Sequence, residues 1–402
     1  MRYDTRICRG LSELTALSPQ WEARRSALGS RHLRHHADWL AIQAQTGGGS
    51  GDPRAVREGA APLVAGAFGD DGLCGVAPFL VHTWRWRCRL GYLSIADFPV
   101  RRAVLCGDSL LADDEPSIQE SLLEAVATDP SYSVVFFESI KVGSTLWSLL
   151  QTSPKLRKRF WMSMSAPTPH RRILLPSTFQ DYLGKFSART RKKLRAYVRK
   201  LDEASGGQLE LRCTRRPAEV RTFLEEAERV SEVSWQGTRL GQVIRVEAQL
   251  PRLLSYAERG WLRAYTLSRS GVPIAFAIGT QADGIYYYEH PAYNPQWGSY
   301  NPGTVLLYRI IEHLYADDRP DEFDFGSGDS EYKQLFSNHG DPCVNALLIR
   351  RTVPMAFPFA LHRACEVGTR LTRRALDRFE LRERVRHLLR RGPSAAPAAV
   401  AA

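Results

Sequence analysis

The chain has 402 residues, of which 44% are hydrophobic, and its formal net charge is +12. This length is enough for two packed domains, and the basic balance favours acidic partners such as nucleotides, anionic polymers, nucleic acid or a membrane face. Its seven cysteines contain no CxxC pair, which disfavours a disulfide or zinc scaffold. No apolar run reaches the ~20 residues of a membrane span, and the N-terminal stretch lacks the apolar core of a secretory signal. We therefore expect a cytoplasmic protein.

The first half predicts a sheet with helices packed on it. Two runs of apolar residues flank a Gly-Asp-Asp-Gly turn, which is typical of a hairpin. The expected elements are a strand at 3–8, helical segments up to 45, the hairpin strands 63–68 and 73–82, a third strand at 85–94, a helix at 118–127, a buried strand at 133–138 and a short helix at 146–150.

His32 and His36 lie four residues apart, the spacing of some metal-binding pairs. However, no Glu lies between them as in HExxH, and the neighbouring arginines repel a cation. We expect a solvated helix start here, and the sequence predicts no metal site.

A strongly basic helix is expected over 186–203, between the two halves. Its cations are Arg189, Arg191, Lys192, Lys193, Arg195, Arg199 and Lys200. They form either a solvated face, helped by pairing with Asp202 and Glu203, or a surface that binds phosphate or a polyanion. Nucleic acid is a less favoured partner, because aromatic residues do not interleave with the basic ones.

The second half repeats the element order of the first. It predicts a strand at 208–213, helices at 217–231 and 242–258, hairpin strands at 261–268 and 273–280, a strand at 285–289, a helix from 303, a strand at 322–325 and a closing strand at 345–350. The repeated order favours an internally duplicated α+β fold with mixed sheets.

A basic amphipathic helix is expected over 357–391, where ten arginines accompany four acidic residues. Its apolar stripe can lie on an anionic membrane surface, or it can pack on the body of the protein or on a partner. The tail from 393 to 402 is expected to be disordered.

The densest group of local signals lies between Tyr300 and Asn338. A turn at Asn301–Thr304 opens a helix, and a strand then ends in a glycine-containing loop before a short helix. Free amides at a helix N-terminus suit a phosphate-bearing cofactor.

Three motifs in this stretch resemble the GNAT superfamily of N-acyltransferases. They are Pro302-Gly303-Thr304 at the helix start, the Phe-Asp-Phe-Gly-Ser-Gly strand end at 323–328, and the Tyr332-Lys333 pair. The resemblance is to the CelD/BcsL type, linked to cellulose and exopolysaccharide synthesis and related to Fem-type aminoacyl transferases. It implies an α+β fold of tandem GNAT-like domains, each a mixed, mostly antiparallel sheet flanked by helices.

The expected domains are a degenerate N-terminal GNAT-like domain over 1–165, a connecting segment with the basic helix over 166–206, a catalytic GNAT-like domain over 207–353, and the basic helix and tail over 354–402. The resemblance implies acetyl-CoA as donor and an amine of a sugar, peptide or small metabolite as acceptor. One departure is that the usual Q/R-x-x-G-x-G/A loop is absent. A Fem-type enzyme that uses aminoacyl-tRNA, or a non-catalytic scaffold for polysaccharide assembly, therefore stays open.

The resemblance also implies site residues. The cofactor-binding candidates are Tyr288, Asn301, Gly303, Thr304 and Gly326, and the catalytic candidates are Glu289, Asp324, Tyr332 and Lys333. Glu289 is expected either to deprotonate the acceptor ammonium or to be a solvated acid at a strand end. Only one of Glu289 and its neighbour His290 is expected to face the cleft, because side chains alternate along a strand. Asp324 either faces the site or lies on an edge strand.

The other two candidates have similar alternatives. Tyr332 is expected to protonate the leaving thiolate or to be a packing residue. Lys333 is expected to hold a phosphate or the developing oxyanion, or to be a surface lysine.

Overall fold

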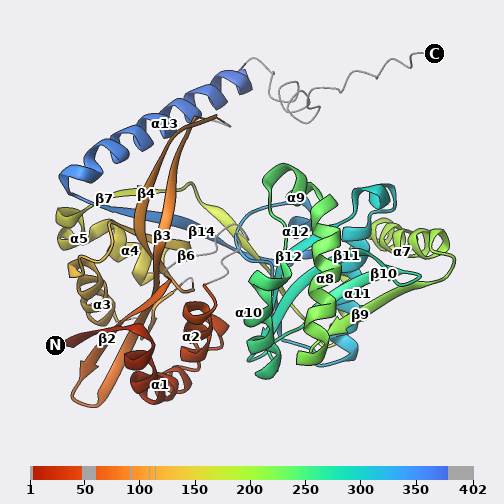
Figure 1. Cartoon of the computed structure of the whole chain (residues 1–402), viewed down its shortest axis with the longest axis horizontal. Coiled ribbons are helices and arrows are strands. Elements are labelled where there is room, and N and C mark those ends of the chain that lie inside the picture. The colour runs from red at the N-terminus through yellow and green to blue at the C-terminus, as the bar shows by residue number, and fades with distance from the viewer. Residues whose placement is uncertain (1–2, 48–59, 91–92, 108, 114, 379–402) are drawn as a thin grey trace.

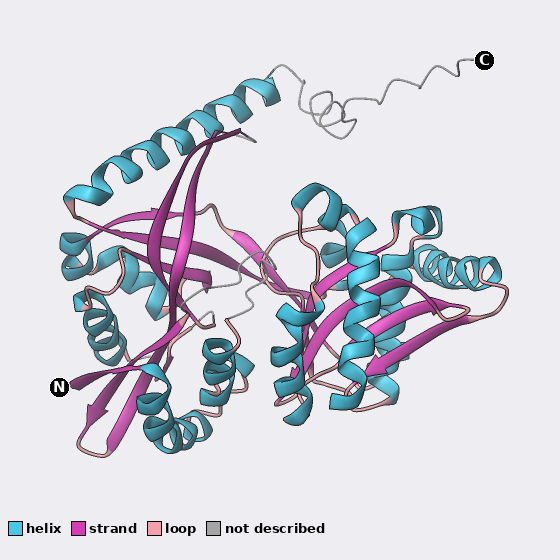
Figure 2. Ribbon diagram, viewed as in Figure 1, coloured by secondary structure: helices cyan, strands magenta, loops and turns pink. Residues whose placement is uncertain are grey.

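The computed structural model describes residues 3–47, 60–90, 93–107, 109–113 and 115–378. One mixed sheet runs through two lobes, with helices on its faces (Figures 1 and 2). Its strand order is β1-β2-β3-β4-β6-β14-β8-β13-β12-β11-β10-β9, and β5 and β7 pair beside this path with β3 and β14. The fold is therefore α+β, as the sequence predicted.

The first lobe holds the elements up to residue 164. In chain order they are β1 (Asp4–Arg9), α1 (Gly10–Ala27), the 3₁₀ helix η1 (Leu33–His35), α2 (Ala37–Gln45), β2 (Ala61–Gly69), β3 (Gly72–Leu90), β4 (Leu93–Leu105), β5 (Leu111–Ala112), α3 (Pro116–Thr128), β6 (Val134–Lys141), α4 (Thr145–Thr152), α5 (Pro154–Arg159) and β7 (Phe160–Met164).

The prediction of a separate strand at 85–94 was wrong. β3 continues to Leu90, and β4 begins at Leu93, so the boundary between the two strands falls inside the expected third strand. The sequence explains why β3 is longer than expected. From Thr83 to Leu90 large apolar residues alternate with arginines, and no turn residue interrupts this two-residue period.

The chain continues from β8 (Thr168–Leu174) into the second lobe and returns to the first lobe with its last strand and last helix. Its further elements are α6 (Phe179–Gly184), α7 (Ala188–Ala204), β9 (Leu209–Thr214), α8 (Pro217–Val233), α9 (Trp235–Leu240), α10 (Val246–Glu258), β10 (Ala264–Arg269), β11 (Val272–Ala282), β12 (Ile285–Tyr293), the 3₁₀ helix η2 (Pro295–Tyr300), α11 (Pro302–Ala316), β13 (Glu322–Asp324), α12 (Glu331–Phe336), β14 (His339–Arg350) and α13 (Val353–Arg378).

The two lobes exchange strands at the centre of the sheet. β14, from the end of the chain, pairs with β6 and β7 of the first lobe, and it also pairs with β8. β8, from the expected connecting segment, pairs in turn with β13 of the second lobe. The sequence predicted only residues 345–350 of β14 and did not predict β8. Neither lobe therefore completes its sheet with its own consecutive strands.

Each lobe contains one parallel strand pair. β4 and β6 pair as far as Val104 and Phe136, and β12 and β13 pair as far as Tyr287 and Asp324. All other strand pairs are antiparallel. Beyond the last parallel pair the two strands separate, and this creates an opening in each lobe.

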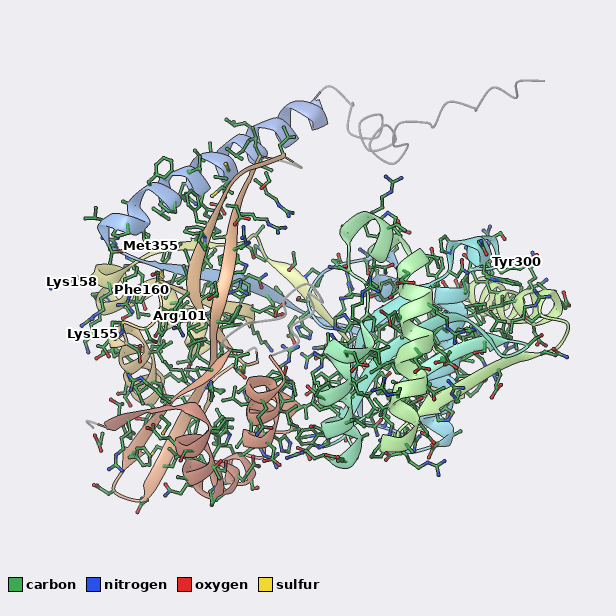
Figure 3. The ribbon with its side chains drawn as sticks, in the orientation of Figure 1. Arg101, Lys155, Lys158, Phe160, Tyr300 and Met355 are labelled. Carbon is green, nitrogen blue, oxygen red and sulfur yellow. The ribbon has the colours of Figure 1, made fainter. Side chains whose placement is uncertain are left out.

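Helix α13 packs along the β3–β4 hairpin (Figure 1). Aromatic rings pack α13 on the first lobe. His362 lies 5.1 Å from Trp86 of β3, and Phe359 stacks at 4.9 Å on Trp161 of β7, both distances being between ring centroids. Met355, at the start of α13, and Phe160 lie in the first lobe, whereas Tyr300 lies at the far side of the second (Figure 3). The described part of the expected C-terminal helix therefore packs on the body. Residues 379–391 of that expected helix, and the expected tail, lie outside the described residues.

None of the helices in the described ranges has the length and hydropathy needed to cross a bilayer.

Replacing Phe359 with alanine should loosen α13. The substitution removes a ring that stacks on Trp161 at an interplanar angle of 5°, and we expect the opening free energy of α13 to fall by about 2 kcal/mol. Amide hydrogen exchange of residues in α13 measures this change. Leu371→Ala is the matched control, because that side chain lies on the same helix and is 58% exposed. Equal exchange rates in the two variants would contradict the proposed anchor.

Candidate functional site

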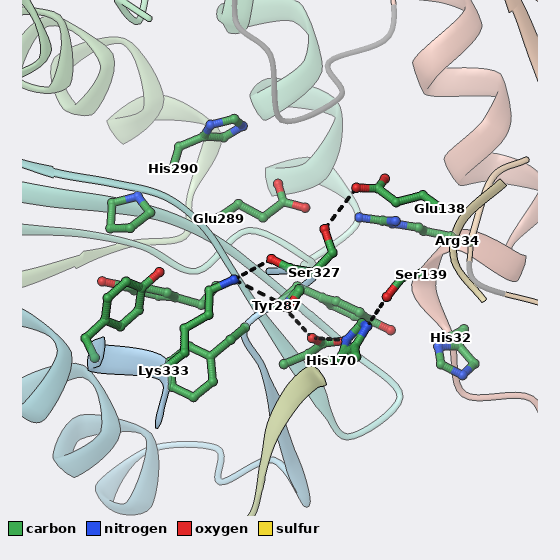
Figure 4. A pocket seen from close by; sticks show the side chains of 17 residues that line it. His32, Arg34, Glu138, Ser139, His170, Tyr287, Glu289, His290, Ser327 and Lys333 are labelled. Carbon is green, nitrogen blue, oxygen red and sulfur yellow. Dashed lines mark hydrogen bonds and ion pairs between the residues drawn. The ribbon is translucent and has the colours of Figure 1, made fainter. Parts of the chain in front are cut away.

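A cavity of about 260 Å³ lies between the two lobes. We call it the junction cavity; Figure 4 shows its lining side chains. Its walls are formed by His32, Arg34, Gly107, Glu138 and Ser139 of the first lobe, by His170 of β8, and by Tyr287, Tyr288, Glu289, His290, Pro291, Asp324, Phe325, Gly326, Ser327, Tyr332 and Lys333 of the second lobe. The openings beyond both parallel strand pairs therefore meet in one cavity.

The segment around η1 is attached to the second lobe. The Arg31 guanidinium pairs with Asp321 at 2.7 Å, and His36 Nε2 lies 2.8 Å from Asp283 Oδ2. The expectation of a solvated helix start here was therefore wrong: these polar side chains bind acidic residues of the second lobe. Their attachment places Arg34, which lies between them, in the wall of the junction cavity.

Arg34 faces three carboxylates in this cavity, and Figure 4 shows its guanidinium beside Glu138. Burial alone lowers the pKa of Arg34, but the charges of Glu138, Glu289 and Asp324 outweigh burial and hold the pKa above its ordinary value. The guanidinium therefore stays charged. The cavity combines a fixed cation with several acids, which suits a ligand that carries an ammonium group.

Asp324 faces the junction cavity, as one of its two predicted alternatives required. Its strand β13 is an inner strand between β12 and β8 and not an edge. His170 Nε2 lies 2.7 Å from Asp324 Oδ1, and the Gly326 amide donates to the same oxygen at 2.6 Å. Burial alone raises the pKa of Asp324. These hydrogen bonds and the nearby cations lower the pKa by more than burial raises it, so the net pKa is below its ordinary value.

Ser139 and His170 are site residues that the sequence did not predict. Ser139 Oγ lies 2.7 Å from His170 Nδ1, so His170 bridges Ser139 and Asp324. The three residues come from β6, β8 and β13, far apart in the sequence. No local motif could have identified them, because the strand exchange brings them together.

Lys333 lies on α12 and is only 9% exposed, which excludes the surface-lysine alternative. Its Nζ donates to the carbonyl oxygens of Ser327 at 2.6 Å and Gly326 at 3.4 Å. Burial lowers the pKa of Lys333, and the charge of Asp324 opposes this. Lys333 therefore holds the loop after β13 while it lines the junction cavity, and its role toward a phosphate or an oxyanion stays a prediction.

Glu289 and His290 both line the junction cavity. The expectation that only one of them would face the cleft was wrong, because His290 has a φ of +46° at an irregularity in the pairing of β11 with β12. This local conformation interrupts the alternation of side chains. β12 also continues to Tyr293, so Glu289 is not at the end of its strand.

A second cavity of about 280 Å³ lies at the start of α11, and we call it the helix-start cavity. Its lining includes four of the predicted cofactor residues, which are Tyr288, Asn301, Gly303 and Thr304. Asn301 precedes the helix with a φ of +55°. Gly303 approaches the Tyr293 ring so closely that a Cβ there would lie 3.2 Å from it. The fifth candidate, Gly326, lines the junction cavity instead.

Tyr332 and Tyr288 line both cavities, and their ring centroids are 6.5 Å apart. Burial raises the pKa of the Tyr332 hydroxyl, so the group stays protonated at neutral pH. The two cavities are therefore adjacent and share an aromatic wall. The protonated Tyr332 hydroxyl lies at their boundary.

Among the residues whose positions are described, no group of three or more His, Cys, Asp or Glu side chains is arranged to hold a metal ion.

Comparisons with known proteins agree with this geometry at the level of the domain. Residues 188–334 match the family model described as an acetyltransferase (GNAT) domain. No curated protein matches the chain. The match covers α7 to α12, which includes the whole wall of the helix-start cavity and the second-lobe wall of the junction cavity.

Solved structures resemble the chain in fold. A structure titled FemX is 12% identical, with 83% of this chain and 96% of that chain covered at a TM-score of 0.54. L-PGS from Bacillus licheniformis is 14% identical, with 83% and 96% covered at a TM-score of 0.47. A tandem GNAT protein from the clavulanic acid biosynthesis pathway is 12% identical, with 85% and 98% covered at a TM-score of 0.47. The first shows likeness of fold alone, and the other two are too distant to support an argument. Residues 188–334 of this chain are therefore similar to an acetyltransferase (GNAT) domain.

Proposed function

We propose that the protein transfers an acetyl group from acetyl-CoA to an amine bound in the junction cavity. One observation carries this proposal: the helix-start cavity and the junction cavity adjoin at Tyr288 and Tyr332. An acyl donor in the first cavity would thus meet an acceptor in the second. Acyl transfer of this kind depends mainly on holding two substrates in the correct relative position.

The helix-start cavity suits the CoA moiety. The Gly303 amide at the start of the 15-residue helix α11 would donate to the pyrophosphate, whereas the Thr304 amide already donates to the Asn301 carbonyl oxygen at 3.0 Å. The basic helix α7 packs against α11 and η2, which adds positive potential nearby. The ladder between β12 and β13 ends at Tyr287 and Asp324, so the strands separate beside Tyr288, where the acyl arm would lie.

The junction cavity suits an amine acceptor. Its carboxylates attract an ammonium group, and Glu289 would take a proton from that group before the nitrogen attacks. Tyr332 would give a proton to the leaving CoA thiolate, because its pKa is raised by burial and it stays protonated.

The substitution Gly303→Glu tests the donor site. It should weaken acetyl-CoA binding by a factor of 10 or more, because a carboxylate and a Cβ at 3.2 Å from the Tyr293 ring would occupy the pyrophosphate position. Isothermal titration calorimetry measures the affinity. Gly184→Glu adds the same charge at a glycine with open space around it, and it should bind as the wild type does. Unchanged affinity in Gly303→Glu would show that the pyrophosphate lies elsewhere.

The acceptor is proposed from the chemistry of the cavity and from the CelD/BcsL-type resemblance. It is an amine of a sugar, peptide or small metabolite that serves as a precursor of an exopolysaccharide or of the cell envelope, and the reaction would take place in the cytoplasm. Mass spectrometry of acetyl-CoA-dependent products, from a pool of metabolites and glycan precursors, identifies it. Products acetylated only on oxygen would contradict the amine assignment.

A Fem-type reaction with aminoacyl-tRNA is the second candidate. It is favoured by the exposed basic face of α7, which includes Lys192, Lys193, Arg195 and Lys200. Loss of activity after ribonuclease treatment would favour this candidate, and full activity in ribonuclease-treated protein with acetyl-CoA would exclude it.

We also propose peripheral contact with an anionic membrane. Large apolar side chains are exposed on α13 and at the end of the β3–β4 hairpin, among them Phe357 at 67% and Leu93 at 68%. The hairpin also carries arginines, including Arg85, whose side chain is 72% exposed and lies 3.5 Å from Asp97. Apolar groups that insert and cations that bind phospholipid headgroups cooperate in such contacts.

The double substitution Leu93→Glu and Phe357→Glu tests this contact. It should reduce flotation with phosphatidylserine-containing vesicles at least about 10-fold, because it replaces inserting groups with charges that the anionic surface repels. Pure phosphatidylcholine vesicles control for charge, and circular dichroism checks that the variant is folded. Unchanged flotation of the variant would contradict the contact.

A further inference from the structure

Some charged side chains of the junction cavity are already held by the chain itself. Asp324 Oδ1 lies 2.7 Å from His170 Nε2, and Glu138 Oε1 accepts a hydrogen bond from the Ser327 hydroxyl at 3.0 Å. Lys333 Nζ donates to two carbonyl oxygens of the loop after β13. These three charges therefore have hydrogen-bonding partners before any ligand enters the cavity.

Two other charged side chains in the wall, Arg34 and Glu289, have no such partner. Within the part of the chain that the structure describes, the Arg34 guanidinium forms no hydrogen bond or ion pair, although the charges of three nearby acids keep it ionised. The Glu289 side chain likewise forms no hydrogen bond or ion pair with a described residue. Because an enclosed charge without a hydrogen-bonding partner is costly, both groups are suited to receive a partner from a ligand.

The two unpaired charges are of opposite sign and come from opposite lobes. Arg34 lies in η1 of the first lobe, and Glu289 lies in β12 of the second. Both line the junction cavity, and Figure 4 shows the guanidinium and the carboxylate entering it from opposite sides. A ligand that pairs with both must carry an anionic group toward the first lobe and a cationic group toward the second. A molecule with both a carboxylate and an ammonium group meets this requirement.

We propose that the acceptor is a free amino acid, whose carboxylate binds Arg34 and whose ammonium group binds Glu289. This rests on the function proposed above, in which Glu289 takes the proton of the amine. The planar guanidinium matches a carboxylate and forms two parallel hydrogen bonds with it. A phosphate suits the position less well, because the acids around Arg34 would repel its second charge.

Arg34 is then a residue that determines specificity. The carboxylate is remote from the reacting nitrogen, so Arg34 binds it equally in the ground state and in the transition state. Loss of such uniform binding raises KM and leaves kcat unchanged. A residue that merely supported the fold of the cavity would show no such split, and its loss would affect all amines alike.

Pairs of acceptors that differ only in the carboxylate test this inference. The full-length protein is assayed for acetyl-CoA-dependent release of free thiol with every standard amino acid and with its decarboxylated amine, such as lysine with cadaverine or histidine with histamine. We expect the best amino acid to have a KM about 10- to 100-fold below that of its amine. In Arg34→Gln the KM of the amino acid should rise until this ratio is below about 3-fold, with kcat unchanged.

A charge-balanced variant separates a contact with the ligand from a mere countercharge. The double substitution Arg34→Gln and Glu138→Gln removes one charge of each sign, so it remains informative if Arg34→Gln alone fails to fold. Circular dichroism checks the fold of both variants. The double variant should still fail to distinguish the amino acid from its amine. Recovery of the preference in the double variant would show that Arg34 only balances Glu138, and it would overturn the proposal.

The amino-acid acceptor and the proposed acetyl transfer fail in different ways. Acetylation of amines with equal KM values for both members of every pair would overturn the amino-acid acceptor and leave acetyl transfer standing. A preference for glucosamine 6-phosphate over every amino acid would overturn the carboxylate assignment. If no amine releases CoA, the proposed function fails, and calorimetry then decides the contact. Binding of an amino acid to the wild type but not to Arg34→Gln would support it, and no binding to the wild type would overturn it.

Discussion

Asp324→Ala is expected to lower the free energy of unfolding at pH 7 by about 3–5 kcal/mol. The carboxylate is 7% exposed and is an acceptor for both His170 and the Gly326 amide. Its removal leaves two partly buried donors without this acceptor, and it leaves Arg34 with one fewer countercharge. Urea denaturation followed by circular dichroism measures the loss.

The loss should depend on pH with a definite sign. The pKa of Asp324 is lower in the folded protein than the value of about 3.9 in an unfolded chain. The ionised carboxylate therefore stabilises the fold fully above about pH 4, and this contribution disappears as the pH falls through the folded-state pKa. The difference between wild type and Asp324→Ala should accordingly shrink below pH 4.

Asp321→Ala is the control for this prediction. Asp321 precedes the same strand and pairs with Arg31, but its side chain is 64% exposed, so its loss should cost less than about 1 kcal/mol. If the two variants were equally stable, the buried hydrogen bonds of Asp324 would not be a major contribution to the fold.

Phe323→Ala should cause a loss of similar size, about 3–5 kcal/mol. The Phe323 ring is completely buried at the centre of the second-lobe core, with the Tyr286 ring 4.9 Å and the Phe325 ring 4.8 Å away between centroids. Alanine would leave a cavity that the neighbouring rings cannot fill, because Tyr286 is fixed on the inner strand β12 and Phe325 is a buried residue directly after β13. Differential scanning calorimetry and urea denaturation both measure the effect.

A neighbouring residue provides the matched control. Leu174 lies on the strand that pairs with β13 and is 47% exposed, so Leu174→Ala should cost less than about 1 kcal/mol. A small loss in Phe323→Ala would indicate that the second-lobe core can repack around a missing ring.

Much of the second lobe could be predicted from the sequence. The start of α11 follows from a proline and glycine after Asn301, and β13 follows from Phe323 alternating with acidic residues. These signals are local, since turn residues and apolar periodicity act over a few positions. The gathering of Tyr288, Gly303 and Thr304 in one cavity agrees with what the resemblance to GNAT-type acyltransferases implied.

The rest of the candidate site depends on contacts that are distant in sequence. Arg34 enters the cavity because its neighbours bind acids of the second lobe, and His170 enters because β8 joins the centre of the sheet. The positive φ angles of Ser139 and His290 arise at irregular strand pairings. No pattern within either segment encodes these contacts, so an argument from periodicity alone could not find them.

The exchanged strands also constrain how the protein is made. β6 ends at Lys141, but its partner β14 begins only at His339. At typical rates of synthesis, about 5–20 residues per second, the ribosome needs on the order of 10–40 s to complete the interval between them. During that time the nascent first lobe exposes an unpaired strand edge, which is prone to aggregation. Premature termination before residue 339 should therefore yield an insoluble fragment, and a nascent chain of this length is a natural client for a chaperone at the ribosome.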